Sequence, residues 1–243
     1  MNFRLRCFAL HLIASLVLAA IAVSIVFGVL YPSPFGEAVG VTEIFLVLLG
    51  VDVVLGPLLT LLVANKEKKT LKFDLSVIVV LQLSAFVYGM SVVASGRPVW
   101  IVFSGDRFDL VQAYQLERSD LEKAAVKYQR LSWMGPNWVA ARMPENVDER
   151  NHLTFESVFG GRDLPQRPEM YVPYADEIEN VQRHAFALNK LNQFNTPQEV
   201  SRVLDDWPEA NSYLPMMARA KPMTVLLRRE TGQVLGVVPL NPW

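Results

Sequence analysis

The sequence predicts an α-helical three-span membrane bundle followed by an α+β domain with a mainly antiparallel sheet. Three apolar runs, at about residues 8–30, 41–64 and 73–94, are each long enough to cross a bilayer as a helix. Charge is unevenly distributed, because residues 1–94 hold only 6 of the 23 Lys and Arg and 5 of the 24 Asp and Glu. We therefore assign residues 1–94 to the membrane bundle and residues 95–243 to a soluble domain of ordinary size.

The first apolar run has two interpretations. Arg4 and Arg6 precede it, and the Ala-Ile-Ala at 20–22 resembles a signal-peptidase site, as in a removable signal peptide. The run nevertheless continues to Leu30, past the length of a typical signal-peptide core. We therefore expect an uncleaved first span, and a mature N-terminus near Ser24 would contradict this prediction.

The second apolar run carries a carboxylate at its centre. An ionised Asp52 at that depth costs at least roughly 2.5 to 3.5 kcal/mol. Gly50 and Gly56 flank the acid and permit close helix packing, and Pro57 removes a backbone donor and favours a bend. A span that only anchors a chain needs none of these residues. We therefore expect this stretch to contact a polar group.

The depth of each polar residue predicts which side chains can meet inside the bundle. Because successive spans run in opposite directions, Asp52 is level with Gln82 and Ser84 of the third run. His11 and Asp74 lie nearer the cytoplasmic face, at depths similar enough for a direct contact. Asp52 either bonds to Gln82 or Ser84 within the bundle or accepts hydrogen bonds from a partner, and the sequence leaves both interpretations open.

The basic residues predict the orientation of the spans. Arg4 and Arg6 flank the first run, and four lysines fill residues 65–72 between the second and third, whereas residues 31–40 contain no Lys or Arg. The positive-inside rule then places the N-terminus and residues 65–72 in the cytoplasm. Because the number of spans is odd, residues 95–243 lie on the other side. Cys7, the only cysteine, lies at the cytoplasmic edge, so the exported domain contains no disulfide.

The soluble domain has strand patterns at both ends and helix patterns between them, which is typical of an α+β fold. Capping boxes begin two of the helices, and a stripe of apolar residues predicts one long helix over 174–194. The expected strands are at about 97–103, 107–111, 137–143, 223–229 and 234–238, the expected helices at about 119–131, 145–159, 174–194 and 196–207, and an expected loop at 160–173.

Catalytic and metal-binding motifs are absent from the sequence, which has no phosphate loop, no GxSxG elbow, no HExxH and no zinc-type cysteine spacing. His152 and His184 fall on different expected helices and lack a His or Cys companion. The net charge of −1 does not favour nucleic acid. We therefore expect a protein that is not an enzyme and has no cofactor, no metal and no nucleic-acid partner.

The tryptophans and one charged turn of the domain have ordinary structural explanations. Asp106 and Arg107 are expected to form a solvated ion pair beside the first turn of the domain. The tryptophans are expected in the core or in a belt at the membrane interface; they are Trp100, Trp133, Trp138, Trp207 and Trp243.

Three stretches resemble the TfpX/TfpZ family of type IV pilin accessory proteins. They are GVDVVLGPLLTL at 50–61, KTLKFD at 69–74 with its basic loop, and GRPVWIVFSGDRFDLV at 96–111. The resemblance extends to PLNPW at 239–243 and is most specific at 50–61. It implies a multi-pass protein of the Gram-negative inner membrane, with a periplasmic domain, that assists a cognate type IV pilin toward pilus assembly. It implies no catalytic residues.

The leading hypothesis joins this resemblance to the buried acid. A chaperone-like accessory protein would bind a pilin and stabilise or deliver it, with Asp52 accepting hydrogen bonds from the membrane segment of the pilin. Gly50, Gly56 and Pro57 would let that segment approach closely. Membrane lipid and other pilus assembly proteins are further expected partners. The side chains expected to support Asp52 within the membrane are Gln82, Ser84, Asp74 and His11.

Two other classes of function remain open at this point. A transporter or enzyme subunit would use Asp52 as a proton-relay acid, with Asp74 and His11 near the cytoplasmic exit. A periplasmic sensor subunit would pass a signal across the membrane and would need a cytoplasmic output partner, because the cytoplasmic segments are short.

Overall fold

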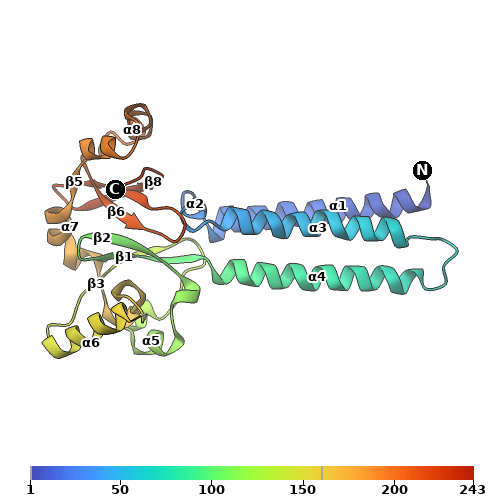
Figure 1. Cartoon of the computed structure of the whole chain (residues 1–243), viewed down its shortest axis with the longest axis horizontal. Helices are drawn as coiled ribbons and strands as arrows, with labels where there is room; N and C mark the ends of the chain where they lie inside the picture. The colour runs from blue at the N-terminus through green and yellow to red at the C-terminus, as the bar shows by residue number, and fades with distance from the viewer. Residues whose placement is uncertain (1, 160) are drawn as a thin grey trace. The chain divides into compact units, whose positions relative to one another are not determined.

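The chain forms two compact units in the computed structural model, which describes residues 2–159 and 161–243 (Figure 1). A helical unit comprises the chain up to Pro32 together with Val41–Gly96. An α/β unit comprises Ser33–Gly40 together with Arg97–Trp243. The predicted fold class, three long apolar helices before an α+β domain, is confirmed.

Three long helices make up the helical unit. They are α1 (Phe3–Ile25), which continues as a π-helical turn over Val26–Leu30, α3 (Val41–Val63) and α4 (Leu71–Ser95). Each is long and apolar enough to cross a membrane. Most of their large apolar side chains are exposed, as expected of helices whose solvent is lipid. Helix α3 packs against both α1 and α4.

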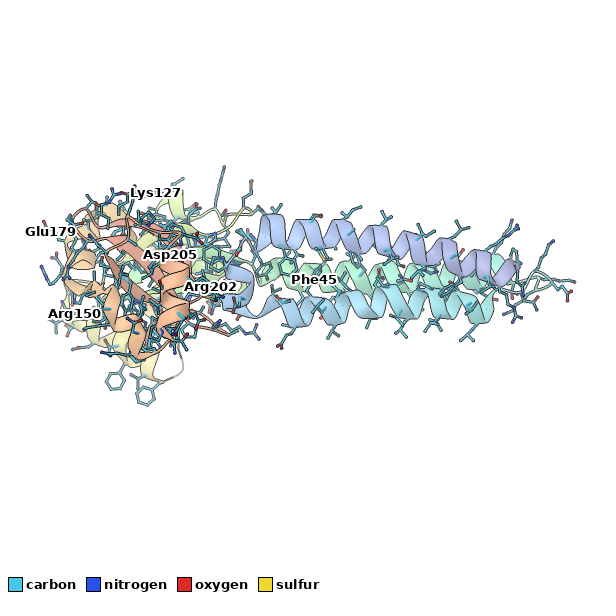
Figure 2. All side chains as sticks on the ribbon, turned by 90° about the horizontal axis from the view of Figure 1, so that it is seen from above. Phe45, Lys127, Arg150, Glu179, Arg202 and Asp205 are labelled. Carbon is cyan, nitrogen blue, oxygen red and sulfur yellow. The ribbon has the colours of Figure 1, made fainter. Side chains whose placement is uncertain are left out.

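Aromatic side chains join the helices at one end of this unit. Phe45, labelled in Figure 2, is fully buried and packs edge-on against Phe27, with ring centroids 5.7 Å apart. The hydroxyl of Tyr31 donates a hydrogen bond to the carbonyl of Val93 at 2.6 Å. Together these contacts link α1, α3 and α4.

The short helix α2 (Phe35–Val39) belongs to the α/β unit, although it connects the first two membrane helices. The carbonyl of Ala38 accepts hydrogen bonds from the N–H groups of Ala220 (2.9 Å) and Lys221 (3.1 Å). The ammonium of Lys221 also pairs with Glu37 at 2.5 Å. The connection between the first two membrane helices is therefore fastened to the domain that follows the third.

One sheet of eight strands organises the described part of the α/β unit (Figure 1). The strand order is β4-β3-β1-β2-β6-β7-β8, with β5 also paired to β6. The β1–β3 and β2–β6 pairs are parallel and the other pairs are antiparallel, so the sheet is mixed, although most of its pairs are antiparallel. The strands are β1 (Pro98–Ser104), β2 (Arg107–Gln112), β3 (Asn137–Ala141), β4 (Tyr171–Val172), β5 (Phe186–Ala187), β6 (Ser212–Met217), β7 (Met223–Arg228) and β8 (Gln233–Val238).

Besides α2, four short α-helices accompany this sheet within the described residues. They are α5 (Arg118–Lys123), α6 (Val147–Val158), α7 (Ile178–His184) and α8 (Pro197–Leu204). Helices α6 and α8 confirm the predictions at 145–159 and 196–207. The expected loop at 160–173 contains two 3₁₀ turns and β4, and its first residue, 160, lies outside the described residues.

Strand β6 was not expected from the sequence. Pro215 argues against an interior strand, because proline has no N–H to donate to a ladder. The structure nevertheless places β6 between β2 and β7. Pro215 lies opposite Thr224 of β7, whereas β2 pairs only with Met216 and Met217 of β6. The proline therefore lies where β2 does not pair with β6, which lets it occupy an interior strand.

The single long helix predicted over 174–194 is wrong. Its residues form a 3₁₀ turn, then α7, then β5 and a further 3₁₀ segment. Ala185 is extended (φ −62°, ψ 132°), which ends α7, and Phe186 then pairs with Tyr213 of β6. Val181 and Leu191 of the predicted stripe remain buried, so pairing with the sheet replaced the helix without exposing its apolar residues.

An aromatic triad explains why α5 ends at Lys123 and does not reach residue 131 as predicted. Ala124 is extended (φ −67°, ψ 157°), so the chain turns and carries Tyr128 into the core. Trp100, Tyr128 and Tyr171 pack edge-to-face with centroids 5.6–5.8 Å apart. Such pairs add about 0.5–1.5 kcal/mol each beyond simple burial. A second core, around Tyr213, lies under α8.

Candidate functional site

A network of hydrogen bonds joins the three long helices around Gln82. The side-chain oxygen of Gln82 can only accept, so Nε2 of His11, 2.9 Å away, donates to it. In a neutral imidazole Nδ1 then accepts, and the Thr60 hydroxyl donates to it at 2.6 Å. The amide nitrogen of Gln82 donates to Oγ of Ser15 and to the backbone carbonyl of Asp52, both at 3.0 Å.

Gly56 makes room for this network. A Cβ at this position would overlap the side-chain amide of Gln82. The absence of a side chain on α3 therefore lets the amide of α4 lie against the backbone one turn beyond Asp52. Gly56 and its neighbour Pro57 are both buried.

The carboxyl group of Asp52 is buried but not satisfied by this network. Its side chain lies in α3 with 3% of the residue surface exposed, and Oδ2 has no hydrogen-bond partner among the described residues. Gln82 bonds the backbone of this residue, not the carboxylate. A buried polar group without a partner is costly, because it loses the hydrogen bonds of water and gains none.

Asp52 lines a groove of about 190 Å³ between α3 and α4. Gly56 and Gln82 are the other lining residues that are not apolar side chains. The apolar lining consists of Leu48, Val51, Leu55 and Leu59 of α3 and Ile78, Leu81, Ala85 and Phe86 of α4. An apolar helix that carries one hydrogen-bond donor has the chemistry to fill such a groove.

The remaining candidate residues from the sequence lie elsewhere in the helical unit. Gly50 is exposed, and a Cβ there would meet no atom within 4 Å. Ser84 is exposed and makes no bond to the acid. Asp74 pairs with Lys68 at 2.6 Å and accepts a hydrogen bond from Thr70. The expected His11–Asp74 contact is therefore replaced by bonds from each residue to other partners.

The structure thus brings His11 and the backbone of Asp52 together through Gln82, which bonds to both. From depth in the membrane alone, His11 was placed nearer the cytoplasmic face than Asp52 and Gln82. Ser15 was missed by the sequence reasoning. It lies four residues after His11, the spacing that puts two side chains on one helix face, and this spacing was the available signal. No bond among the described residues links the Asp52 carboxyl to His11 or Asp74, as a proton relay through them would need.

The α/β unit holds a second group of ionisable residues beside a cavity of about 630 Å³. Arg142 pairs with Glu177 at 2.6 Å, and Asn180 donates to the same carboxylate at 2.5 Å. Burial raises the pKa of Glu177, but the hydrogen bonds from Asn180 and Arg142 outweigh it and hold that pKa below its ordinary value. This arrangement is a satisfied structural ion pair.

At Asp109, burial outweighs the neighbouring cation, so the pKa of the carboxyl is raised and not lowered. Burial raises the pKa of its carboxyl to about 6, although Arg107, with Nε 3.3 Å away, opposes the shift. Arg107 thus pairs with Asp109 and not with Asp106 as expected. Among residues 2–159 and 161–243, no group of three or more His, Cys, Asp or Glu is arranged to hold a metal ion.

Comparison with known proteins places these features in a family context. The family model described as Fimbrial assembly protein FimB matches residues 1–40. The fimbrial assembly protein of serogroup I from Dichelobacter nodosus is 32% identical over 185 residues, which cover 75% of this chain and 72% of that protein. The serogroup E1 protein of the same organism is 31% identical over 200 residues, which cover 81% and 77%. No solved structure matches the chain.

Proposed function

Because the chain belongs to the fimbrial assembly protein family, we propose that it is a membrane-embedded assembly factor that binds a cognate type IV pilin and stabilises or delivers it. The relatives are named for fimbrial assembly, which supports a role in pilus assembly. The resemblance of residues 50–61 to TfpX/TfpZ accessory proteins supports the choice of a pilin as the client. The role is non-enzymatic in this proposal.

The single observation that carries the client-binding role is the buried Asp52 carboxyl in the groove between α3 and α4, whose Oδ2 has no hydrogen-bond partner among the described residues. A pilin waiting in a membrane holds an apolar helix in lipid. A donor group on that helix would satisfy Oδ2, and the helix would cover the apolar walls of the groove. The low dielectric of the bilayer strengthens such a bond.

Gly50 and Gly56 have different positions on α3 and therefore different roles in this proposal. Gly50 is exposed but does not line the groove beside Asp52, so it makes no contact with a client helix seated there. Gly56 and Pro57 are buried, so they act from inside by fixing Gln82 and the shape of α3. His11 and Gln82 hold the three helices in register, whereas Asp74 and Ser84 have no direct part.

We assign the protein to the bacterial inner membrane, with the N-terminus cytoplasmic and residues 97–243 periplasmic. The four lysines at 66–72 support the cytoplasmic placement of that connection. The bonds of Ala38 to Ala220 and Lys221 support a common side for α2 and the α/β unit, as three spans require. The domain would then contact the globular head of the pilin and give specificity for one client.

Replacement of Asp52 tests the client-binding role. Asp52→Asn and Asp52→Leu are expected to lower co-purification of the pilin from detergent and to lower surface piliation. The matched control is Asp74→Asn, which removes an equal charge from α4 but leaves the groove intact. Unchanged pilin capture and piliation in both Asp52 variants would remove this residue from the interaction.

A further inference from the structure

An exposed apolar loop follows α5 in the α/β unit. Val126, Trp133 and Met134 are 81%, 59% and 82% exposed, although each is a large hydrophobic residue. Tyr128 lies between them in sequence and is buried in the aromatic triad, so the loop is anchored to the core near its start. The segment 126–134, called the interface loop below, therefore presents apolar side chains from a fixed base.

The charged residues within this loop are all basic. From residue 123 to residue 144 the sequence contains no Asp or Glu. Lys127 and Arg130 lie within the loop and are exposed, and Lys127 is labelled on the surface in Figure 2. Exposed Trp and other large apolar side chains flanked by Lys and Arg are typical of segments that enter the boundary between lipid headgroups and acyl chains.

The covalent chain ties the loop to the end of a membrane helix. Helix α4 ends at Ser95, and Arg97 follows two residues later, a separation of at most about 7 Å. The guanidinium of Arg97 stacks on the ring of Trp133 at 3.8 Å, and its Nε donates to the carbonyl of Ser132 at 2.9 Å. The headgroup layer is itself roughly 5–8 Å thick on each side.

From these three observations we propose that the interface loop inserts into the lipid headgroup layer where α4 leaves the bilayer. Trp133, Met134 and Val126 enter the acyl boundary, and Lys127 and Arg130 pair with anionic headgroups. The occupant is the lipid of the membrane that holds the spans. The loop thereby fixes which side of the α/β unit faces the membrane and which side faces a client.

A second exposed apolar surface on the same unit lacks this chemistry and supplies a matched control. Phe155, Val158 and Phe159 are exposed on or just after α6, but Asp148, Glu149 and Glu156 make that helix acidic. Anionic lipid therefore repels it. No short covalent connection ties α6 to a spanning helix.

A local lipid-contact experiment on the full chain tests the proposal. Cys7→Ser removes the natural thiol, and Met134→Cys or Val158→Cys then carries an environment-sensitive fluorophore in vesicles containing phosphatidylglycerol. The label at 134 is expected to show blue-shifted emission and to lose most of its intensity when the lipids carry a quencher near the headgroup. The label at 158 is expected to show neither change. Unquenched emission at 134 would overturn the proposal, whether the emission is aqueous because the loop lies in water or blue-shifted because a protein partner covers the loop.

The basic residues are tested in the same assay. Lys127→Glu with Arg130→Glu is expected to reduce quenching at position 134. The control pair, Lys190→Glu with Arg202→Glu, changes two exposed basic residues far along the chain and is expected to leave quenching unchanged. Equal quenching in all three proteins would overturn the role given to the two cations. Neither result depends on whether the client is a pilin.

Discussion

The side-chain amide of Gln82 occupies the space that a Cβ of Gly56 would need. This fit places the amide where it reaches His11, Ser15 and the backbone of Asp52 at once. One missing methyl group on α3 therefore allows one amide of α4 to join all three helices.

Gly56→Ala is expected to displace Gln82 and break its bonds. The expected loss is about 1–3 kcal/mol of unfolding free energy, from steric overlap and from buried polar groups left unpaired. Thermal unfolding in detergent measures it. Gly50→Ala is the control, because its Cβ meets nothing within 4 Å and alanine favours the helix. Equal effects of the two substitutions would show that the fit between Gly56 and the Gln82 amide does not contribute to stability.

Asp52→Leu is expected to make the free protein more stable while weakening client capture. The buried carboxyl has an unpartnered oxygen, and removing it relieves a desolvation cost on the order of 1–3 kcal/mol. Thermal unfolding without the client is the measurement. Asp74→Asn, which breaks the pair with Lys68, is expected to have little effect or a slightly destabilising one. A clear destabilisation by Asp52→Leu would mean that the carboxyl already has a partner inside the bundle.

Asp109 is expected to make stability fall as the pH rises. Burial raises the pKa of this carboxyl to about 6, so between about pH 4 and pH 6 the folded state binds a proton that the unfolded state has lost. The folded protein therefore loses stability through that window. Asp109→Asn cannot ionise and should be more stable than the parent at pH 7.5 by about 1–3 kcal/mol, and nearly equal at pH 4. Unfolding curves across this range test it.

Glu177→Gln supplies a control of opposite sign. Its carboxylate has a lowered pKa, because the bonds from Asn180 and Arg142 outweigh its burial. Its contribution to stability is present above its ordinary pKa and is lost as the pH falls. The Gln variant is therefore expected to be less stable than the parent at pH 7.5. If both variants shifted stability in the same direction, the charge balance described for one of them would be wrong.

Gly40→Ala is expected to loosen α2. Gly40 has φ +72°, a conformation that costs alanine about 1 kcal/mol, and its Cβ would lie 2.9 Å from that of Ala220. Faster proteolysis within residues 33–40 would report the release. Gly105→Ala is matched, because its φ is +74° but its Cβ meets no atom within 4 Å. Similar proteolysis of both variants at α2 would show that the contact with Ala220 is unimportant.

Hydrophobic length predicted the three long helices well, because crossing a bilayer constrains length and polarity directly. It could not predict which faces meet, since helices that are apolar all round carry no periodic signal. The bond from Gln82 to the backbone of Asp52, instead of to its carboxylate, depends on that rotation. In the α/β unit, Phe186 lies in a strand despite a helical sequence pattern, and Pro215 lies in an interior strand despite having no N–H to donate. Pairing across the sheet determined the conformation of both residues.

The bonds between α2 and residues 220–221 make the periplasmic half of the proposed architecture discontinuous in sequence. Glu37 and Lys221 are 184 positions apart. Helix α2 is synthesised early, but it can form these bonds only after the β6–β7 turn has been synthesised. A fragment that begins at Arg97 lacks part of its own fold and leaves the N–H groups of Ala220 and Lys221 without the Ala38 carbonyl. A soluble version of this domain would need residues 33–40 supplied back to it, by a graft or as a peptide.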